Sequence, residues 1–444
     1  MRILSITAGA AGMYCGSCAR DNALAVELLK RGHDVTLLPL YTPTTTDETN
    51  VAAPRVLFGG ISVYLQQYVP FFRWTPRFLD RLWDSPRVIQ AFASRAISTD
   101  ARLLGDMTVS MLEGTRGVLR KEFDKLIEWL ADEPAPEVIN LPNALLIGLA
   151  APLRERLQRP ICCTLQGEDL FLDQLVEPYR TRAIELIRRE TAHVDRFLSV
   201  SDYYVPVMSD LMRVERSRIT VVPLGINLDG YTPRPARGDG VFCVGYFARI
   251  APEKGLQQLA EAYTILRRRT GDAPLRLEAA GYLGGAQQSY LDGVRKTLEA
   301  AGLGDEFTYR GQVDRDGKLA FLGSLDVLSV PATYDEPKGL FLLEGMARGV
   351  PVVQPRRGAF TEIVEKTGGG LLVSPDSPAA LADSLYTLWK DRALGERLGR
   401  TGHAGVRDHY SIERSTDRLL AGYERAIADA SRRIAGIVPG RATA

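Results

Sequence analysis

The sequence predicts an α/β fold with two doubly wound domains that face a central cleft. Three observations support this prediction. β-prone runs alternate with helix-like runs in both halves of the chain. The segment LGINLDGYTPRPARGDG at 224–240 is rich in Gly, Pro and charge, which is typical of a linker. Glycines punctuate the turn after the first strand, where such sheets place ligands.

The first half begins as a strand, a glycine-rich turn, a helix and a second strand. Residues 2–7 are β-prone, the helix stops at Gly32, and residues 33–40 form the next strand. Such a βαβ unit implies a parallel sheet with right-handed crossovers. Further strands of this half are expected at 137–141, 160–165, 196–200 and 219–223.

Regular alternation is lost from about residue 42 to residue 130, where we expect an insertion. Its aromatic residues are expected in the core of inserted helices, with stacking on a ligand as the alternative: Phe71, Phe72, Trp74, Phe78 and Trp83. Its arginines are expected on solvated helix faces, with an anionic ligand or an anionic membrane surface as the alternative partner: Arg73, Arg77, Arg81 and Arg87.

The second half repeats the pattern, with a helix after Lys254 that places apolar residues on one face. Strands are expected at 241–247, 275–280, 307–309, 327–330 and 350–353. A late helix at 412–430 is expected to cross back towards the first half. The domain boundaries that we predict are 1–225, a linker at 226–240, a second domain at 241–411, a returning helix at 412–435 and a disordered tail at 436–444.

Composition narrows the class of protein. The chain has 444 residues, 45% apolar and 25% charged, with a formal net charge of +1, so nucleic acid is not the expected partner. The first residues do not resemble a signal peptide, and no apolar run is long enough to span a membrane. Five cysteines in such a long chain do not form a disulfide framework. We therefore expect a cytoplasmic enzyme; the oligomeric state is open.

Two of the cysteines form a Cys-x-x-Cys pattern, Cys15 and Cys18, at an expected helix start. A redox role requires a lowered thiol pKa, which a helix N-terminus can provide. The same position is where this fold needs a loop of small residues near a bound phosphate. We expect the two cysteines to be incidental small residues that line the cleft, with regulatory oxidation as the alternative. A metal site shared with Cys162 or Cys163 lacks an evident fourth ligand.

Charged residues in the turns of the second half suggest a diphosphate site. Arg249 and Lys254 follow the first strand of this half, and Glu336 and Glu344 flank Gly339 at an expected helix start. A helix N-terminus exposes unpaired N–H groups and favours phosphate. The two cations can stabilise a departing diphosphate without a metal ion, and a carboxylate in the helix can accept hydrogen bonds from ribose hydroxyls.

These residues resemble the donor half of family 4 glycosyltransferases, which have two Rossmann-like domains in the GT-B fold. The resemblance rests on Arg249 with Lys254, on EPKGLFLLE, on GMARGVPVV and on GAFTEIVEKTGGGLLVSP. GAAGMYCGSCARDNALAVELLKRGHDV resembles the first loop and helix of the same family, and VVPLGINLDGYTP its interdomain segment. The resemblance covers nearly the whole chain except about residues 42–130.

The resemblance implies roles for the charged residues. Arg249 and Lys254 would bind the diphosphate, and Glu344 would bind the ribose. Glu336 would contact the sugar near the reacting centre, so that Glu336, Arg249 and Lys254 form the catalytic group.

It also implies roles for backbone groups. Gly339 and Leu340 would give N–H groups to phosphate, and Gln312 and Val313 would border the nucleobase. Gly12 would sit over the phosphates from the first domain.

The sequence departs from the family pattern at three positions. Lys338 stands where the family commonly has an aromatic residue, Gln166 where it has a histidine, and Leu224 where it has an asparagine. On the acceptor side the candidates are Gln166, Glu168 and Asp169; helix capping and a plain strand-end role are the alternatives. The insertion at about 42–130 is expected to shape the acceptor site, where its aromatic residues could stack on a sugar ring and its arginines could bind an anionic acceptor.

The expected function is retaining transfer of a hexosyl group from a nucleoside-diphosphate sugar to a hydroxyl acceptor, which is a sugar, a lipid-linked molecule or a small molecule. UDP is the favoured nucleotide, with ADP and GDP open. We expect domain closure and front-face displacement, with no metal and no cofactor. The alternatives are a nucleotide-sugar epimerase or hydrolase, a catalytically silent nucleotide-sugar-binding protein, and a thiol–disulfide enzyme that uses Cys15 and Cys18.

Overall fold

The computed structural model describes residues 1–9, 15–54, 56–58, 63, 66–67, 101–234 and 240–434. The chain divides into two compact units, one of residues 1–223 with the segment from Ser415 onward, and one of residues 224–414. Each unit has a parallel sheet and a hydrophobic core of its own. The predicted α/β class, with a doubly wound sheet in each half, is confirmed.

The sheet of the first unit has the strand order β2-β1-β3-β4-β5-β6 in the described residues, and all its pairings are parallel. Strands buried on both faces read as continuous apolar runs, as in ICCTL of β4, which has no exposed residue. The strands are β1 (Arg2–Thr7), β2 (Asp34–Pro39), β3 (Val138–Leu141), β4 (Ile161–Leu165), β5 (Arg196–Ser199) and β6 (Ile219–Val221).

Helices connect these strands in the described residues: α1 (Gly16–Lys30), α5 (Ala101–Glu113), α6 (Arg120–Asp132), α7 (Ala150–Leu157), α8 (Glu168–Asp173), α9 (Tyr179–Glu190) and α10 (Tyr204–Met212). The middle part of the expected insertion, residues 68–100 with its aromatic and arginine candidates, lies outside the described residues. Its last part forms α5 and α6, whose apolar faces join the core of the unit through Met111, Leu112 and Phe123.

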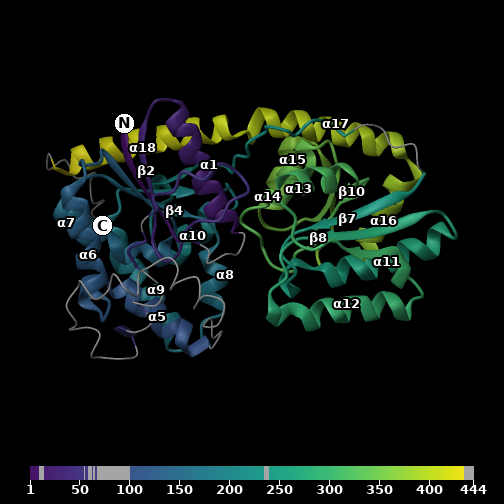
Figure 1. The fold of residues 1–444 in the computed structure, drawn as a ribbon, viewed down its shortest axis with the longest axis horizontal. Coiled ribbons are helices and arrows are strands. Elements are labelled where there is room, and N and C mark those ends of the chain that lie inside the picture. The colour runs from purple at the N-terminus through teal and green to yellow at the C-terminus, as the bar shows by residue number, and fades with distance from the viewer. Residues whose placement is uncertain are drawn as a thin grey trace, which may run out of the picture. The chain divides into compact units, whose positions relative to one another are not determined.

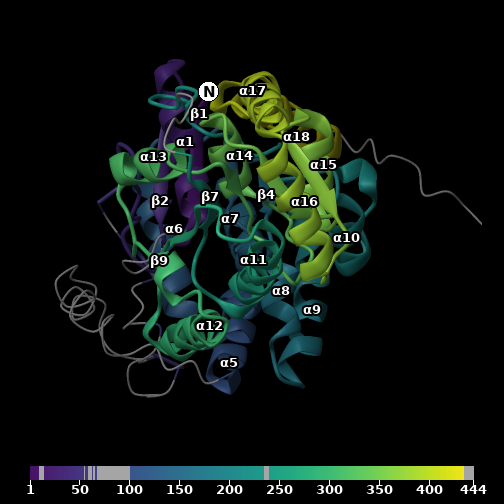
Figure 2. The same cartoon turned by 90° about the vertical axis from the view of Figure 1, so that its right-hand side faces the viewer.

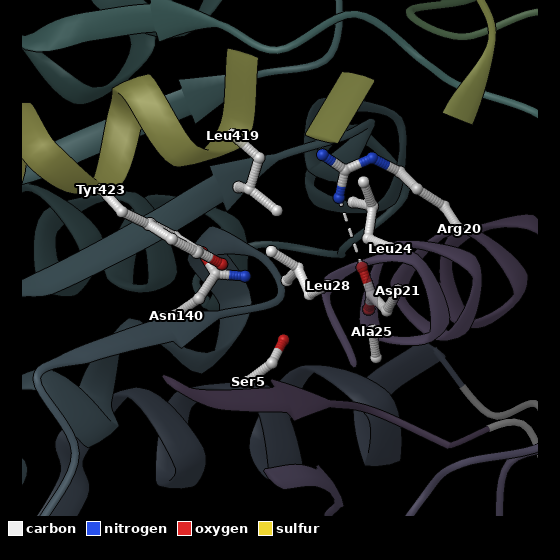
Figure 3. A pocket seen from close by; sticks show the side chains of 9 residues that line it. All are labelled: Ser5, Arg20, Asp21, Leu24, Ala25, Leu28, Asn140, Leu419 and Tyr423. Carbon is white, nitrogen blue, oxygen red and sulfur yellow. Dashed lines mark hydrogen bonds and ion pairs between the residues drawn. The ribbon is translucent and has the colours of Figure 1, made fainter. Parts of the chain in front are cut away.

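The last helix, α18 (Ile412–Ile434), packs on the first unit from Ser415 onward. Figure 3 shows Leu419 and Tyr423 of α18 on one side of a small cavity and Arg20 and Asp21 of α1 on the other. Arg20 and Asp21 form an ion pair at 3.3 Å. The cavity that these residues line is about 10 Å³, room for at most one water molecule. It is therefore part of the packing beneath α18 and too small for a sugar or a nucleotide.

The second unit contains another parallel sheet, with the strand order β12-β11-β10-β7-β8-β9 among the described residues. Its strand order reverses direction between β7 and β10, the point at which doubly wound sheets bind ligands. The strands are β7 (Phe242–Phe247), β8 (Leu275–Ala280), β9 (Phe307–Tyr309), β10 (Val327–Leu328), β11 (Val352–Pro355) and β12 (Gly370–Val373).

Helices cover both faces of this second sheet. Figure 1 shows α11 and α12 on one side and α14 and α15 on the other, and Figure 2 shows α17 running beside α15, with which it packs. The helices are α11 (Leu256–Thr270), α12 (Gln288–Ala300), α13 (Arg315–Gly323), α14 (Leu340–Ala347), α15 (Gly358–Thr367), α16 (Pro378–Lys390) and α17 (Arg392–His409).

The predicted strands at 2–7, 275–280 and 307–309 coincide with β1, β8 and β9. The strand predicted at 350–353 lies two residues later, at Val352–Pro355, and β12 was not predicted. Glycines at the start of β12 weaken its strand signal, and it is the pairing with β11 that makes it a strand. Among the described helices, none has the length and apolarity to cross a membrane.

Candidate functional site

The candidate site lies at the carboxyl ends of β7 and β10 in the second unit. The loop after β7 carries Arg249 and Lys254, and the loop after β10 carries Glu336 and leads into α14 at Gly339. Because both strands run in the same direction, their carboxyl ends lie at one edge of the sheet. Residues 82 positions apart in the sequence are thereby brought into contact.

Lys254, Tyr334 and Glu336 form one hydrogen-bonded cluster. Lys254 Nζ donates to Tyr334 Oη at 2.6 Å and to Glu336 Oε2, and Tyr334 Oη donates to the same carboxylate oxygen. Lys254 Nζ also lies 5.0 Å from the centre of the Tyr334 ring and 5.7 Å from that of Phe341. The hydrogen bonds to Tyr334 and Glu336 use two of the three ammonium protons of Lys254, and the third remains for a ligand.

Glu336 is buried and ionised. Burial opposes its ionisation, but the charges of Lys254 and Lys338 and the hydrogen bonds from Lys254 and Tyr334 outweigh burial and lower the pKa of Glu336 from 4.5 to about 2. The Lys338 backbone N–H also donates to Oε1 at 3.3 Å. Burial, together with the neighbouring Glu336 charge, raises the pKa of Tyr334, so this phenol stays a proton donor. The cluster is therefore a fixed carboxylate with cations on two sides.

The loop that presents Lys254 requires a glycine at its next position. Gly255 has φ +77, and a Cβ there would lie 1.9 Å from the carbonyl oxygen of Pro331. No side chain fits at this distance, so the backbone after β7 approaches the backbone after β10 closely. This approach holds Lys254 against the cluster.

Gly339 caps the N-terminus of α14 as predicted. Its φ is +117, a value that only glycine adopts without strain. Within the described part of the chain, the backbone N–H groups of Gly339, Leu340 and Phe341 have no hydrogen-bond partner. A helix end with unpaired N–H groups and a nearby ammonium group is suited to a phosphate.

Glu344 lies on α14, slightly more than one turn from Gly339, as predicted. Its Oε1 accepts a hydrogen bond from Lys318 Nζ of α13 at 2.8 Å and a longer one from Tyr231 Oη at 3.4 Å. The side chains of Lys318 and Glu344 are 5% and 7% exposed. Glu344 is thus a buried carboxylate with a buried cation as its counter-ion.

Arg249 is not part of the Lys254 cluster in the described residues. Its guanidinium pairs with Glu253 at 2.5 Å, and its side chain is 54% exposed. Exposed pairs of this kind contribute little stability, so the side chain can leave Glu253 at small cost. Arg249 therefore stays a predicted ligand contact that would have to reorient.

Of the predicted backbone contacts in loops, two lie among the described residues and one does not. Gln312 is exposed and Val313 half-buried, in the loop between β9 and α13, and their contact with a nucleobase stays a prediction. Gly12 lies outside the described residues.

In the first unit, Glu168 and Asp169 begin α8, directly after β4 and Gln166. Glu168 is buried and accepts backbone N–H groups of Ala144, Gln166 and Gly167 at 2.7 to 2.8 Å. Burial raises the pKa of Glu168 although these hydrogen bonds oppose the shift. Its carboxylate organises the strand-end loop.

The other two acceptor-side candidates differ from Glu168. Asp169 accepts a hydrogen bond from Tyr204 Oη at 2.6 Å. The Gln166 amide nitrogen donates to the Pro142 carbonyl at 2.6 Å, while its Oε1 is buried without a partner in the described residues. Of the three, Gln166 keeps an acceptor atom unused.

The Cys18 thiol is not the exposed, acidic thiol that a nucleophile requires. A hydrogen bond with Cys15, followed by burial, raises the pKa of the Cys18 thiol well above its usual value. Cys18 is 1% exposed. Cys18 itself is therefore a poor nucleophile, and the expectation that the two cysteines are incidental stays a prediction.

Sequence reasoning missed three residues of the site. Tyr334 lies two positions before Glu336, Lys318 lies in α13, and Tyr231 lies in the segment that we assigned to the linker. Tyr231 is 4% exposed, which is unusual for a linker residue. A lysine on the apolar side of α13 is the one signal that could have suggested a buried counter-ion.

Two family models match the chain. Residues 234–404 match the model described as glycosyl transferases group 1, and residues 108–229 match the model described as glycosyltransferase family 4.

Curated proteins resemble about half of the chain. D-inositol 3-phosphate glycosyltransferase of Paenarthrobacter aurescens is 32% identical over 219 residues, which are 47% of this chain and 52% of that protein. Phosphatidyl-myo-inositol mannosyltransferase of Mycobacterium leprae is 29% identical over 217 residues, 48% of this chain and 54% of that protein. The chain therefore spans about half the length of the curated relatives that it matches.

Solved structures resemble the whole fold at low identity. Sucrose-phosphate synthase of Thermosynechococcus elongatus superposes with a TM-score of 0.70 at 18% identity, over 96% of this chain and 99% of that one. Anabaena HepE in complex with UDP-glucose superposes with a TM-score of 0.64 at 15% identity, over 95% and 98% of the two chains. At these identities the likeness shows a shared fold, the GT-B fold.

Proposed function

Since the chain belongs to the glycosyltransferases that the group 1 and family 4 models describe, we propose that it is a retaining hexosyltransferase. Its donor is a nucleoside-diphosphate sugar, with a UDP-sugar as the first choice, and its acceptor is a hydroxyl group. One observation carries this proposal: Lys254 is held against the buried carboxylate of Glu336 beside the open N-terminus of α14.

The charges of the second unit suit a diphosphate leaving group. Lys254 has an ammonium proton to spare, Arg249 is free to swing from Glu253, and the N–H groups at Gly339 and Leu340 point out of the first turn of α14. Together they supply the positive potential that a departing diphosphate needs, so no metal ion is required in this proposal.

The proposed step is a front-face displacement. The bond between C1 of the sugar and the β-phosphate oxygen breaks while the acceptor oxygen bonds to C1 on the same face. The acceptor proton passes to an oxygen of the leaving phosphate. Glu336 is ionised because of Lys254 and Lys338. Its carboxylate accepts hydrogen bonds from sugar hydroxyls and stabilises the positive charge that develops at C1 in the transition state.

For the acceptor we propose only a chemical class. The curated relatives carry names in which the acceptor is an inositol phosphate or phosphatidyl-myo-inositol. These two molecules share a phosphorylated polyol with free hydroxyls. They are the first acceptors to test, ahead of a wider panel of sugars, lipid-linked sugars and small molecules.

A combined binding and product assay tests the proposal. Thermal shift with UDP, ADP, GDP and their glucose and mannose conjugates identifies the nucleotide, because a ligand of the folded state raises the unfolding midpoint. Release of nucleoside diphosphate with and without acceptor, with the glycoside analysed by NMR for its anomeric configuration, tests transfer. A glycoside of retained configuration in the presence of EDTA is the expected result.

Other products would contradict the proposal. An isomerised sugar nucleotide without a glycoside identifies an epimerase, and a free sugar that forms equally well without acceptor identifies a hydrolase. Binding without turnover on any acceptor identifies a silent binding protein.

A further inference from the structure

The Glu344 carboxylate on α14 is paired with a residue that no role yet covers. The side chains of Lys318 and Glu344 are 5% and 7% exposed, so both ends of this ion pair are removed from water. Lysine is almost never so buried without a partner, and a lone buried carboxylate is costly. Each charge is therefore tolerated because of the other.

The two carboxylate oxygens of Glu344 differ. Oε1 accepts both hydrogen bonds that the carboxylate makes, from Lys318 Nζ at 2.8 Å and Tyr231 Oη at 3.4 Å. Oε2 accepts none from the described residues, and it is not among their buried oxygens without a partner, so it keeps accessible surface. The pair thus holds one oxygen and leaves the other to a ligand.

The helix that supplies Lys318 is anchored at its start and also contacts Tyr231. Asp314 caps α13 by accepting the N–H of Gly317 at 2.8 Å, so the start of the helix that carries Lys318 is anchored. Tyr231 is held on its other side by the Arg315 guanidinium, 5.8 Å from the ring centre. The counter-ion is therefore presented by a rigid support, as an oriented carboxylate requires.

We propose that Lys318, assisted by Tyr231, is a positioning residue that holds one carboxylate oxygen of Glu344 and turns the other oxygen towards the hydroxyls of a ribose. This inference rests on the proposed function, because it assumes a bound nucleoside diphosphate. It makes the Lys318–Glu344 pair the device that discriminates a ribonucleotide from a deoxyribonucleotide.

The test uses titration calorimetry to compare the dissociation constants of UDP and 2′-deoxy-UDP. If ADP or GDP binds the wild type better than UDP, that nucleotide and its 2′-deoxy form are compared instead. Wild type is expected to prefer UDP by about tenfold, the effect of one good hydrogen bond to a charged group. Lys318→Met is expected to weaken UDP about tenfold and to change 2′-deoxy-UDP by less than about twofold, so that the preference disappears. Lys318→Arg, which keeps the charge, should retain the preference.

Two further variants keep the test decisive. Lys390→Met removes an exposed lysine of α16 in the same unit and should leave both constants unchanged. If Lys318→Met does not fold, Lys318→Gln keeps a hydrogen-bond donor and should lower the preference by at least about threefold. A variant that weakens UDP and 2′-deoxy-UDP equally, or leaves both unchanged, overturns the inference alone. A wild type that binds no nucleoside diphosphate overturns the proposed function as well.

Discussion

Lys254→Met tests whether the ammonium group at the centre of the site is what keeps Glu336 ionised. Methionine replaces the aliphatic stem of lysine closely in length and removes its charge. The variant leaves a carboxylate that is 3% exposed without its principal counter-ion. We expect it to lose donor binding and to become less stable at neutral pH.

The size of the stability loss follows from the pKa of Glu336. That pKa falls from 4.5 to about 2 on folding, and each unit corresponds to about 1.4 kcal/mol, so the ionised carboxylate contributes on the order of 3 kcal/mol. A lowered folded-state pKa gives stability that is present above pH 4.5 and lost as the pH falls towards 2. Lys338 remains in the variant, so we expect a loss of about 2–3 kcal/mol at pH 7 that shrinks as the pH falls through this window.

Urea unfolding of the ligand-free protein, followed by circular dichroism at pH 7 and pH 3, measures this loss. Lys390→Met, on the exposed face of α16, is the matched control and should unfold like wild type. Glu336→Gln added to Lys254→Met removes the buried charge and should recover much of the stability. A loss of equal size at both pH values would refute the reasoning, because it would not depend on the Glu336 charge.

Three further predictions concern the same protein. Arg249→Ala should lower the transfer rate by roughly 100-fold or more but change the free energy of unfolding by less than about 0.5 kcal/mol, since the ion pair of Arg249 is exposed. Arg269→Ala also breaks an exposed ion pair and should leave the transfer rate and the stability unchanged. Equal transfer rates of Arg249→Ala and wild type would contradict the assignment. Gly339→Ala should cost roughly 1–3 kcal/mol in unfolding free energy because φ is +117, and should weaken binding of UDP in calorimetry; unchanged values would show that this backbone is not strained by a side chain. Cys15→Ala combined with Cys18→Ala should retain transfer activity, because neither thiol takes part in the proposed displacement step; loss of activity in a folded variant would restore the thiol hypothesis.

The sequence predicts the strands well where local composition and packing agree. Leu275–Ala280 alternates apolar and charged residues before it ends in two alanines, and β8 takes this range because it pairs with β7 on one edge and β9 on the other. Gly370–Val373 lacks such a signal, since glycine disfavours strands, and β12 exists through its pairing with β11. Tertiary pairing decides that element, which is information that the local sequence does not carry.

The candidate site was predictable where spacing along one element fixes proximity. Glu344 lies on the helix that Gly339 starts, so both could be assigned from the pattern alone. The partners of the carboxylates could not, because Lys318 and Tyr231 come from other elements and meet Glu344 only in the folded unit. Arg249 shows the converse: its spacing from Lys254 suggested a joint site, but it pairs with Glu253 four residues later.

The central claim is that a diphosphate binds between Lys254 and the N-terminus of α14. A crystal structure of the protein with UDP tests it most directly. We predict the β-phosphate within hydrogen-bonding distance of Lys254 Nζ and of the Leu340 N–H, with Arg249 turned towards the phosphates. Density for the nucleotide elsewhere, with Lys254 and the Gly339 turn free of phosphate, would contradict the account.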